Sequence, residues 1–335
     1  MKKKTDLTLI VDFGGSGTKF LYWKAESAAR SLFMEPEVTS TSSELIEQKK
    51  KGSPLSPEMF CWFTTGGLKT KTFAVGALAR QFQGHAGLGQ NKYTRAAIKA
   101  IAGCVVLVAS DRHLRRKKTI LLDISMFLPY GEASNFPYFQ KIFNSLTRNE
   151  SGIQTDYGTF QFRLNQVFSR QEGEGIYRAL PNAEKSQKLA LMMVGYRNMS
   201  VLTADRGTVL SGQTTDLGMI RLVEQVGEAE GLTDFSALAA AIAQAGLNLT
   251  NRVPFQKLFS KEPSGMKQER IDNLVKVIAR SRQNYVDQLV NWFREVVSGD
   301  IDTILLAGGT ATYLGSELSG RSEERRVGKE CTLRC

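Results

Sequence analysis

Two similar strand–turn–strand patterns constrain the fold of this chain more than any other feature of its sequence. The first, VDFGGSGTKFLYW at 11–23, places strand-forming residues before and after a cluster of glycines. The second, LALMMVGYRNMSVL at 189–202, again has two apolar runs around a turn, and Gly207 then breaks the chain before TVLSG. The recurrence predicts a duplicated architecture with one such turn in each half.

The first turn has the residues of a phosphate-binding loop but fits neither of two common types. A Walker loop needs G-x-x-x-x-G-K-[ST], whereas Lys19 lies two residues after Gly17 and Phe20 follows it. A dinucleotide fingerprint needs a third glycine and a helix, and neither follows. Gly14, Gly15 and Gly17 would let backbone N–H groups form a concave anion site. An ordinary glycine hairpin is the alternative.

A third glycine cluster lies near the C-terminus, in ILLAGGTATYLG at 304–315. Gly308, Gly309 and Thr310 follow a short apolar strand and come just before a predicted helix. Such a strand-to-helix junction is a suitable place for a nucleotide to lie against the backbone.

The alternation of strands and helices in each half predicts an α/β fold with a cleft between two related domains. We expect the first domain at 1–185 and the second at 186–320. The polar segment 39–57 is expected to be mobile. Apolar residues at helical spacing predict a long helix near 269–297, and FSALAAAIAQAGLNL predicts another.

Composition predicts an intracellular, cytoplasmic protein without a membrane partner. The longest apolar run, AIAGCVVLVAS, is too short to span a bilayer. The N-terminal MKKK resembles the start of a signal peptide, but Asp12 and the glycines end the apolar stretch that follows. Cys61 and Cys104, with His85 and His113, provide neither a disulfide framework nor a zinc site.

The net charge of +11 raises the question of nucleic-acid binding. The densest basic run is RHLRRKK at 112–118, just before a predicted strand. A solvated loop is one interpretation, and contact with DNA or with an acidic face of a neighbouring subunit is another. No aromatic residues separate these cations, as a stacking platform for single-stranded nucleic acid would require.

The glycine-rich stretches resemble the motifs of a known superfamily. Asp12, Gly14, Ser16 and Lys19 match the first phosphate motif of the superfamily of actin, heat-shock chaperones and sugar kinases. VGYRNMSVL resembles its second phosphate motif, and LLAGGTATYL its adenosine motif. Within it, the chain is most similar to bacterial actin-like plasmid-partitioning proteins of the ParM/StbA type over residues 7–318. Further similar stretches are FAVGALARQF, NKYTRAAIKAIAG, ILLDISMFLPYGE and SGQTTDLGMIRLVEQV.

The resemblance implies an actin-like (ribonuclease H-like) fold of two domains with a nucleotide in the interdomain cleft. It implies ATP or GTP with Mg²⁺, self-association into filaments, and a separate adaptor protein bound to plasmid DNA. Two alternatives remain open. One is a small-molecule kinase of the same superfamily, for which Asp123 and Asp216 are candidate catalytic residues. The other is a nucleotide sensor that does not polymerise.

The resemblance also assigns roles to residues of the proposed site. Asp12 would hold the water shell of the metal ion, and Lys19 would contact phosphate oxygens as a point charge. A turn-capping role is the alternative for Asp12. The remaining residues assigned to nucleotide binding are Gly14, Gly15, Ser16, Gly17, Gly195, Arg197, Asn198, Gly308, Gly309 and Thr310.

One glutamate is a candidate for catalysis. RQEGEGIY at 170–177 resembles a family turn, usually Pro-Glu-Gly, whose glutamate orients the attacking water. Glu172 matches it if Gln171 replaces the proline. Glu174 is the alternative, and a solvated acidic loop is another reading.

One position departs from the family. Most members have an acid two residues before the glycine of the second phosphate motif, where this chain has Met193. Methionine neither binds the metal's waters nor acts as a base. We therefore expect slow hydrolysis of ATP or GTP.

The C-terminal segment 321–335, RSEERRVGKECTLRC, differs from the rest of the chain. It has no helical or strand periodicity, and it resembles a translated sequencing adapter. We therefore interpret it as a non-native tail, with a charged natural tail as the alternative. The interpretation implies that the final segment, which in the family packs back on the first domain, is lost after Gly320.

Overall fold

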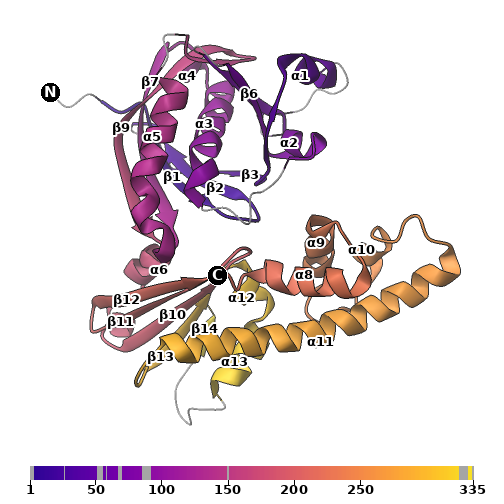
Figure 1. Cartoon of the computed structure of the whole chain (residues 1–335). Coiled ribbons are helices and arrows are strands. Elements are labelled where there is room, and N and C mark those ends of the chain that lie inside the picture. The colour runs from indigo at the N-terminus through magenta and orange to yellow at the C-terminus, as the bar shows by residue number, and fades with distance from the viewer. Residues whose placement is uncertain are drawn as a thin grey trace. The chain divides into compact units, whose positions relative to one another are not determined.

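The chain forms two compact units, Met1–Glu172 and Gly173–Cys335. The computed structural model, drawn in Figure 1, describes residues 4–25, 27–50, 56–57, 59–66, 70–84, 92–148, 151–323 and 331–333. The division between the units falls earlier in the chain than the expected boundary at residue 185, because two short helices, α6 (Glu174–Ala179) and α7 (Asn182–Lys185), belong to the second unit. His85 of the sequence analysis lies outside the described residues.

In the described part of the first unit, nine strands form one sheet in the order β3-β2-β1-β7-β9-β8-β5-β6-β4. The elements of this unit are β1 (Leu7–Phe13), β2 (Thr18–Trp23), β3 (Arg30–Met34), β4 (Val38–Thr41), α1 (Ser43–Lys50), β5 (Cys61–Thr65), β6 (Lys71–Val75), α2 (Ala77–Gln81), α3 (Lys92–Ser110), α4 (Arg112–Arg115), β7 (Thr119–Leu128), the 3₁₀ helix η1 (Tyr130–Asn135), α5 (Phe136–Thr147), β8 (Ile153–Thr155) and β9 (Gly158–Gln171).

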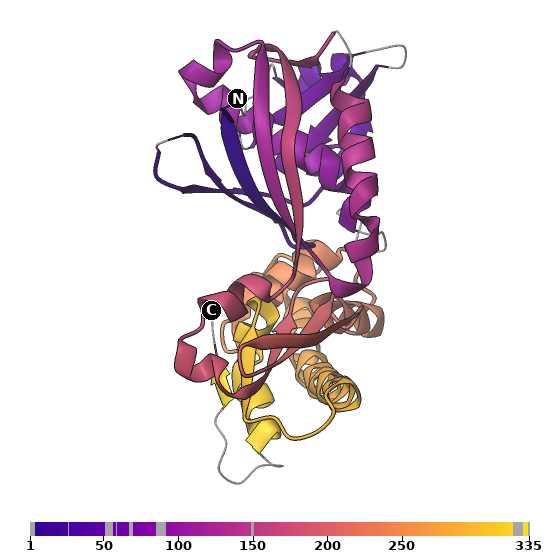
Figure 2. The ribbon, with the colours of Figure 1, turned by 90° about the vertical axis from the view of Figure 1, so that its left-hand side faces the viewer.

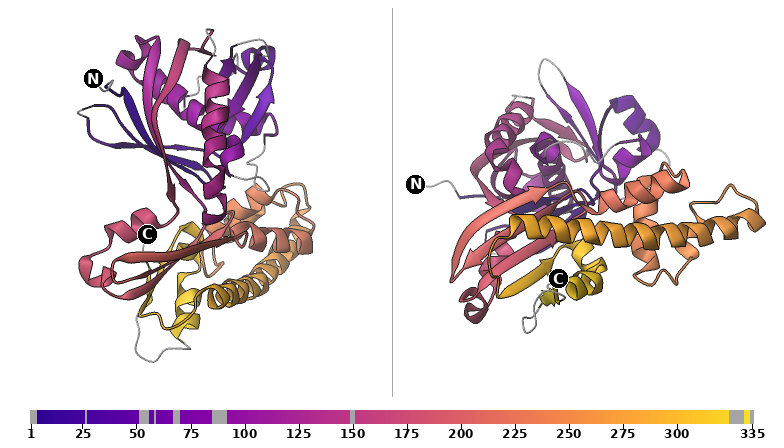
Figure 3. Two further views of the ribbon diagram at one scale, coloured as in Figure 1. Left: turned by 60° about the vertical axis from the view of Figure 1, so that its left-hand side comes forward. Right: turned by 60° about the horizontal axis from the view of Figure 1, so that its bottom comes forward.

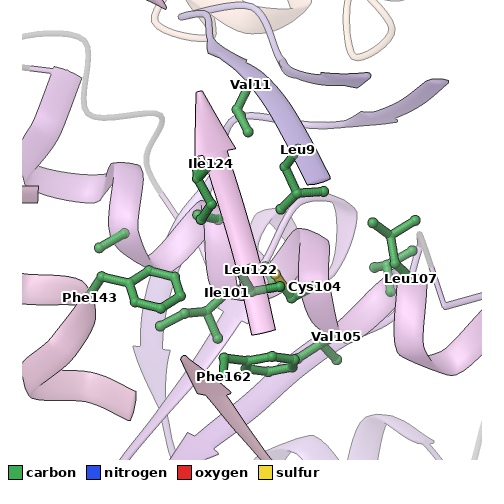
Figure 4. Packing of buried hydrophobic residues seen from close by; sticks show 14 of the residues in the cluster. Leu9, Val11, Ile101, Cys104, Val105, Leu107, Leu122, Ile124, Phe143 and Phe162 are labelled. Atoms are coloured by element: carbon green, nitrogen blue, oxygen red, sulfur yellow. The ribbon is translucent and has the colours of Figure 1, made fainter. Parts of the chain in front are cut away.

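The centre of this sheet is parallel, and helices cover one of its faces. β7 pairs in parallel with both β1 and β9, whereas β2 and β3 continue the sheet in antiparallel fashion. Along β1 and β7, fully buried residues alternate with half-buried ones, as expected when one face packs on a core. α3 contacts β1 and α5 contacts β9 (Figure 2). Figure 4 shows strand residues such as Leu9 and Leu122 packed with Ile101 and Cys104 of α3.

The segment 39–57 was expected to be mobile, and most of its described residues belong to a strand and a helix. β4 pairs with β6, with Val38 opposite Val75, and α1 follows. Ile46 of α1 is fully buried in a small cluster with Leu78 and Ala79 of α2. One apolar side chain in a polar stretch therefore anchors the helix. Residues 51–55 and 58 lie outside the described residues.

The second unit contains a smaller sheet, whose described strands are in the order β12-β11-β10-β13-β14. Besides α6 and α7, its elements are β10 (Lys188–Val194), β11 (Met199–Asp205), β12 (Thr208–Thr215), α8 (Met219–Glu230), α9 (Phe235–Ala245), α10 (Val253–Gln256), α11 (Ser264–Val296), β13 (Thr303–Ala307), α12 (Gly309–Tyr313), α13 (Gly315–Glu323) and β14 (Cys331–Leu333).

Both helices that the sequence predicted in this unit are confirmed. α11 is the longest, and residues of its predicted apolar stripe, among them Ile271, Leu274 and Ile278, are buried. α11 runs beside α8 and α13 (Figure 3). α9 coincides with the alanine-rich stretch and is capped by Asp234, whose carboxylate accepts a hydrogen bond from the Ala237 N–H group.

The two sheets share a topology, which confirms the duplication that the sequence predicted. The order β3-β2-β1-β7 in the first unit corresponds to β12-β11-β10-β13 in the second. In both series the first strand is antiparallel to the second, and the second is antiparallel to the third. The fourth strand is parallel to the third.

The C-terminal segment contains secondary structure that the sequence analysis did not predict. α13 extends to Glu323, and β14 pairs in parallel with β13, with Ile304 opposite Cys331. Residues 324–330 and 334–335 lie outside the described residues. The non-native origin of 321–335 stays a prediction.

Candidate functional site

The turn between β1 and β2 has a backbone that only glycine allows at two places. The pair Phe13 and Thr18 closes a four-residue turn, 14–17. A Cβ atom on Gly14 would lie 2.8 Å from the carbonyl oxygen of Gly17. A Cβ atom on Gly17 would lie 2.2 Å from Cε2 of Phe33. The turn is therefore a tight backbone loop, as the sequence predicted.

Two opposite charges lie next to this turn. Asp12 and Lys19 are directly opposite each other in the antiparallel pair of β1 and β2, so their side chains leave the same face of the sheet. Asp12 is half-buried and Lys19 is exposed, while Ser16 is exposed at the tip of the turn. Thr18, which sequence reasoning missed, is 1% exposed, and its hydroxyl has no hydrogen-bond partner among the described residues.

Glu172 lies at the same edge of the sheet as Asp12. In register, Asp12 pairs with Phe127 of β7 and Phe127 pairs with Arg170 of β9, so all three parallel strands end together. Glu172 follows β9 directly, is half-buried, and donates its N–H group to the carbonyl of Leu128 at 3.0 Å. β1 and β9 are two strands apart, which separates Asp12 from this strand end by about 10 Å.

Glu174, the alternative candidate, is engaged elsewhere. Its carboxylate accepts two hydrogen bonds from the guanidinium of Arg178, one turn further along α6, at 2.6 and 2.9 Å. The carboxylate of Glu174 is therefore committed to Arg178.

The turn between β10 and β11 is the counterpart of the first, and two neighbouring helices fix it. It also has four residues, 195–198, and the Gly195 N–H group donates to the carbonyl of Asn198 at 2.9 Å. The Gly195 carbonyl accepts hydrogen bonds from the N–H group of Met219, the first residue of α8, and from the hydroxyl of Thr310 in α12, both at 3.0 Å. Gly195 of the second predicted motif and Thr310 of the third are thus in direct contact.

Two glycines let the elements around the second turn approach each other. A Cβ atom on Gly218 would lie 2.2 Å from the carbonyl carbon of Arg197. Gly308 has φ of 94°, and a Cβ atom there would lie 2.5 Å from the carbonyl oxygen of Val194. By contrast, a Cβ atom on Gly309 would meet no atom within 4 Å, so the start of α12 has an open side.

Gly218 was missed by sequence reasoning, although its position directly before the amphipathic helix α8 was a usable signal. Tyr285 of α11 is fully buried. Its hydroxyl donates a hydrogen bond to the carbonyl of Leu217 at 3.0 Å and so fixes the segment before α8. Burial raises the pKa of Tyr285, which keeps this hydroxyl protonated as a donor.

Met193 occupies the position that corresponds to Asp12. Each lies two residues before the first glycine of its turn, and the residue opposite Met193 in the adjacent strand is Ser200 rather than lysine. A Cβ atom on Gly173 would lie 2.5 Å from Cε and 2.8 Å from Sδ of Met193. Met193 therefore packs against the residue that follows Glu172.

The two aspartates considered for a kinase reaction are held in structural contacts. Asp123 accepts hydrogen bonds from the Thr5 hydroxyl at 2.8 Å and the Asn165 amide at 2.9 Å, and it lies opposite Thr8, towards the far end of β1 from Asp12. Asp216 is exposed and forms an ion pair with Arg221.

The described residues include neither a cluster of metal ligands nor a membrane-spanning helix. They contain no group of three or more His, Cys, Asp or Glu residues that could hold a metal ion. Within the same part of the chain, no helix is both long enough and apolar enough to cross a membrane.

Several solved structures are similar to this chain over nearly its whole length. The crystal structure of the actin-like protein Alp7A has a TM-score of 0.66 at 14% identity, covering 98% of this chain and 91% of that one. ParM from a 15-stranded filament of Clostridium botulinum gives 0.65 at 15% identity, covering 98% and 95%. Bacillus thuringiensis ParM with ADP gives 0.51 at 11% identity, covering 98% and 93%. The sequence matches no protein-family model and no curated protein.

The chain therefore has the two-domain actin-like fold. ParM and Alp7A have this fold, and the likeness to them extends over nearly the whole chain.

The residues present fit a nucleotide with its metal ion. The first turn combines a tight glycine backbone with a carboxylate and an ammonium group on one face of the sheet. The second unit, taken by itself, contains a fixed turn and the open side of α12 at Gly309. Backbone N–H groups and a lysine suit phosphate, and one carboxylate suits a magnesium ion that keeps several waters.

Proposed function

We propose that this chain is a nucleotide-dependent, self-polymerising actin-like protein that segregates plasmid DNA in the cytoplasm through a separate adaptor protein. The observation that carries the proposal is the pair of corresponding turns, 14–17 and 195–198, at equivalent places in a fold shared with ParM and Alp7A. One of the similar structures is a ParM filament, and another is ParM with ADP.

The nucleotide is ATP or GTP and binds together with Mg²⁺. When bound, the nucleotide would supply a phosphoanhydride bond and an electrophilic terminal phosphate. The carboxylate of Asp12 accepts hydrogen bonds from the waters of the metal ion, and Lys19 neutralises phosphate charge. Gly14, Gly15 and Gly17 direct backbone N–H groups at phosphate oxygens, with Ser16 at the tip.

Residues of the second unit bind the remaining parts of the nucleotide. The turn of Gly195, Arg197 and Asn198 contacts phosphate. Gly308 and Gly309 place the backbone at the start of α12 against the nucleoside, because no side chain covers Gly309. Thr310 acts indirectly by holding the Gly195 carbonyl.

Hydrolysis is slow in this proposal. Glu172 orients the attacking water from the end of β9, on the sheet edge that also carries Asp12. Met193 offers no oxygen at the position where most related proteins have an acid. Filaments with bound triphosphate therefore persist for longer than those of proteins with both acids.

Sedimentation of the purified full chain with ATP, GTP or ADP tests the proposal, with phosphate release recorded on the same samples. We expect a triphosphate to move the protein into the pellet, with phosphate release lagging behind assembly. ADP and chelation of Mg²⁺ serve as controls and should leave the protein in the supernatant.

Two other outcomes would contradict the proposal. Phosphoryl transfer to an added sugar or alcohol without assembly would identify a small-molecule kinase, although the contacts of Asp123 and Asp216 give no support to that function. Tight nucleotide binding with neither assembly nor transfer would identify a nucleotide sensor.

A further inference from the structure

An N-terminal cap and one buried side chain hold the backbone of the short helix α4 in place. Asp111 caps it, because its carboxylate accepts hydrogen bonds from the N–H groups of His113 at 2.8 Å and Leu114 at 3.1 Å. Leu114 is 2% exposed and anchors the turn in the core of the first unit. The other side chains of α4 therefore extend from a backbone that these contacts hold in place.

The two carboxylates next to α4 are already neutralised. Asp111 forms an ion pair with Lys24. Asp6 forms an ion pair with Lys117 and also accepts a hydrogen bond from the N–H group of Leu121 at 2.9 Å. The charge of Lys117, one of the cations of the basic run 112–118, is therefore already paired with a carboxylate.

Four cations of that run remain exposed, and none has an ion pair with a described residue. We name Arg112, Arg115, Arg116 and Lys118 the α4 cationic cluster. The three arginines are spaced i, i+3 and i+4, which places them on one face of the turn with neighbouring Cβ atoms about 6 Å apart. The C-terminal dipole of α3 accounts for about half of one positive charge, not four.

We propose that the α4 cationic cluster binds the phosphate backbone of duplex DNA directly and without sequence preference. Closely spaced guanidinium groups match phosphate oxygens, and neutralising several phosphates releases counterions. The run 112–118 contains no Phe, Tyr or Trp, and the imidazole of His113 is its one ring, so the run lacks the successive stacking rings that favour single strands. The net charge of +11 disfavours a second copy of this chain as the partner.

The cluster and the first phosphate turn lie at opposite ends of one strand. β7 begins at Thr119, directly after the cluster, and Phe127 near its other end pairs with Asp12 (Figure 1). Nine residue spacings of extended strand separate the ends by about 30 Å. DNA and nucleotide therefore occupy separate places on the first unit, and this inference does not depend on nucleotide binding.

Fluorescence anisotropy of a short labelled duplex of arbitrary sequence, titrated with the full chain, tests the proposal. Four neutralising substitutions, Arg112→Gln, Arg115→Gln, Arg116→Gln and Lys118→Gln, remove the cluster. A matched variant with the same net charge removes four other exposed cations of the first unit, namely Lys49→Gln, Lys71→Gln, Lys141→Gln and Arg148→Gln.

We expect the wild type to bind duplex DNA with an affinity that falls about a hundredfold between about 50 and about 200 mM salt, as four neutralised phosphates imply. The cluster variant should bind about a hundredfold more weakly at the lower salt concentration, and the matched variant only slightly more weakly than the wild type. Asp12→Ala should bind DNA like the wild type even where it no longer binds nucleotide.

Any of three results would overturn the proposal. The first is wild-type protein that does not bind the duplex. The second is an equal loss of affinity in the two quadruple variants, which would assign binding to net charge alone. The third is polyglutamate bound as tightly as DNA, which would make an acidic polypeptide the partner.

Discussion

The turns at 14–17 and 195–198 occupy the same place in the two halves of a duplicated fold, but they are built differently. The first has charged residues in the strands beside it, Asp12 and Lys19. The second has Met193 and Ser200 at the corresponding positions, and instead α8 and α12 hold its backbone through the Gly195 carbonyl. In the proposed function the first turn supplies charge and metal binding, while the second supplies a fixed backbone.

The largest effect is expected from Gly218→Ala, which targets the fixed backbone of the second turn. The new Cβ atom would lie 2.2 Å from the backbone of Arg197, where no flexible side chain can yield. We expect a loss of about 3 kcal/mol in the free energy of unfolding, measured with urea, together with weaker nucleotide binding. Gly265→Ala in α11 is the matched control, because its Cβ atom meets nothing within 4 Å. Equal stability of the two variants would contradict the close packing of this turn.

Glu172→Ala tests the sheet edge that Asp12 and Glu172 share. We expect phosphate release to slow by about a hundredfold while nucleotide affinity is kept, because only the positioning of water is lost. Glu174→Ala is the control, since that carboxylate is paired with Arg178. Slower release in the Glu174 variant alone would exchange the roles of the two glutamates.

Met193→Asp would make the second turn chemically more like the first. The shorter, charged side chain should fit beside Gly173 and accept hydrogen bonds from the waters of the metal ion. We expect phosphate release about tenfold faster. Met193→Asn has the same size without the charge and should leave the rate near that of the wild type. Acceleration by both variants would trace the slow rate to the bulk of methionine rather than to the missing acid.

The smallest effect is expected from Thr310→Val, which removes one of the two hydrogen bonds to the Gly195 carbonyl. The N–H group of Met219 still satisfies that oxygen, so thermal or urea unfolding should show a loss of about 1 kcal/mol. Thr203→Val, at a hydroxyl pair between β11 and β12, serves as the control. A loss of several kcal/mol would mean that Thr310 does more than hold this carbonyl.

Patterns local in sequence predicted much of the fold and part of the site. Strand-forming residues around glycines located both turns, and the apolar stripe located α11. By contrast, the burial of Ile46 depends on α2, and the importance of Gly218 depends on a contact with Arg197. Such long-range contacts leave no periodic signal in the chain, which is why α1 was missed and why the close packing at Gly218 could not be predicted, although its position before α8 could have drawn attention to it.

The proposed function depends most on the charge beside the first turn, and titration calorimetry of ATP and GTP with and without Mg²⁺ measures the role of that charge directly. Wild-type protein should bind at least one of the two nucleotides more tightly with Mg²⁺. Asp12→Ala should lose that dependence on Mg²⁺ while keeping a normal circular dichroism spectrum, because Asp12 is a half-buried residue at a strand end. Unchanged affinity and unchanged Mg²⁺ dependence in this variant would contradict the assignment of charge and metal binding to the first turn.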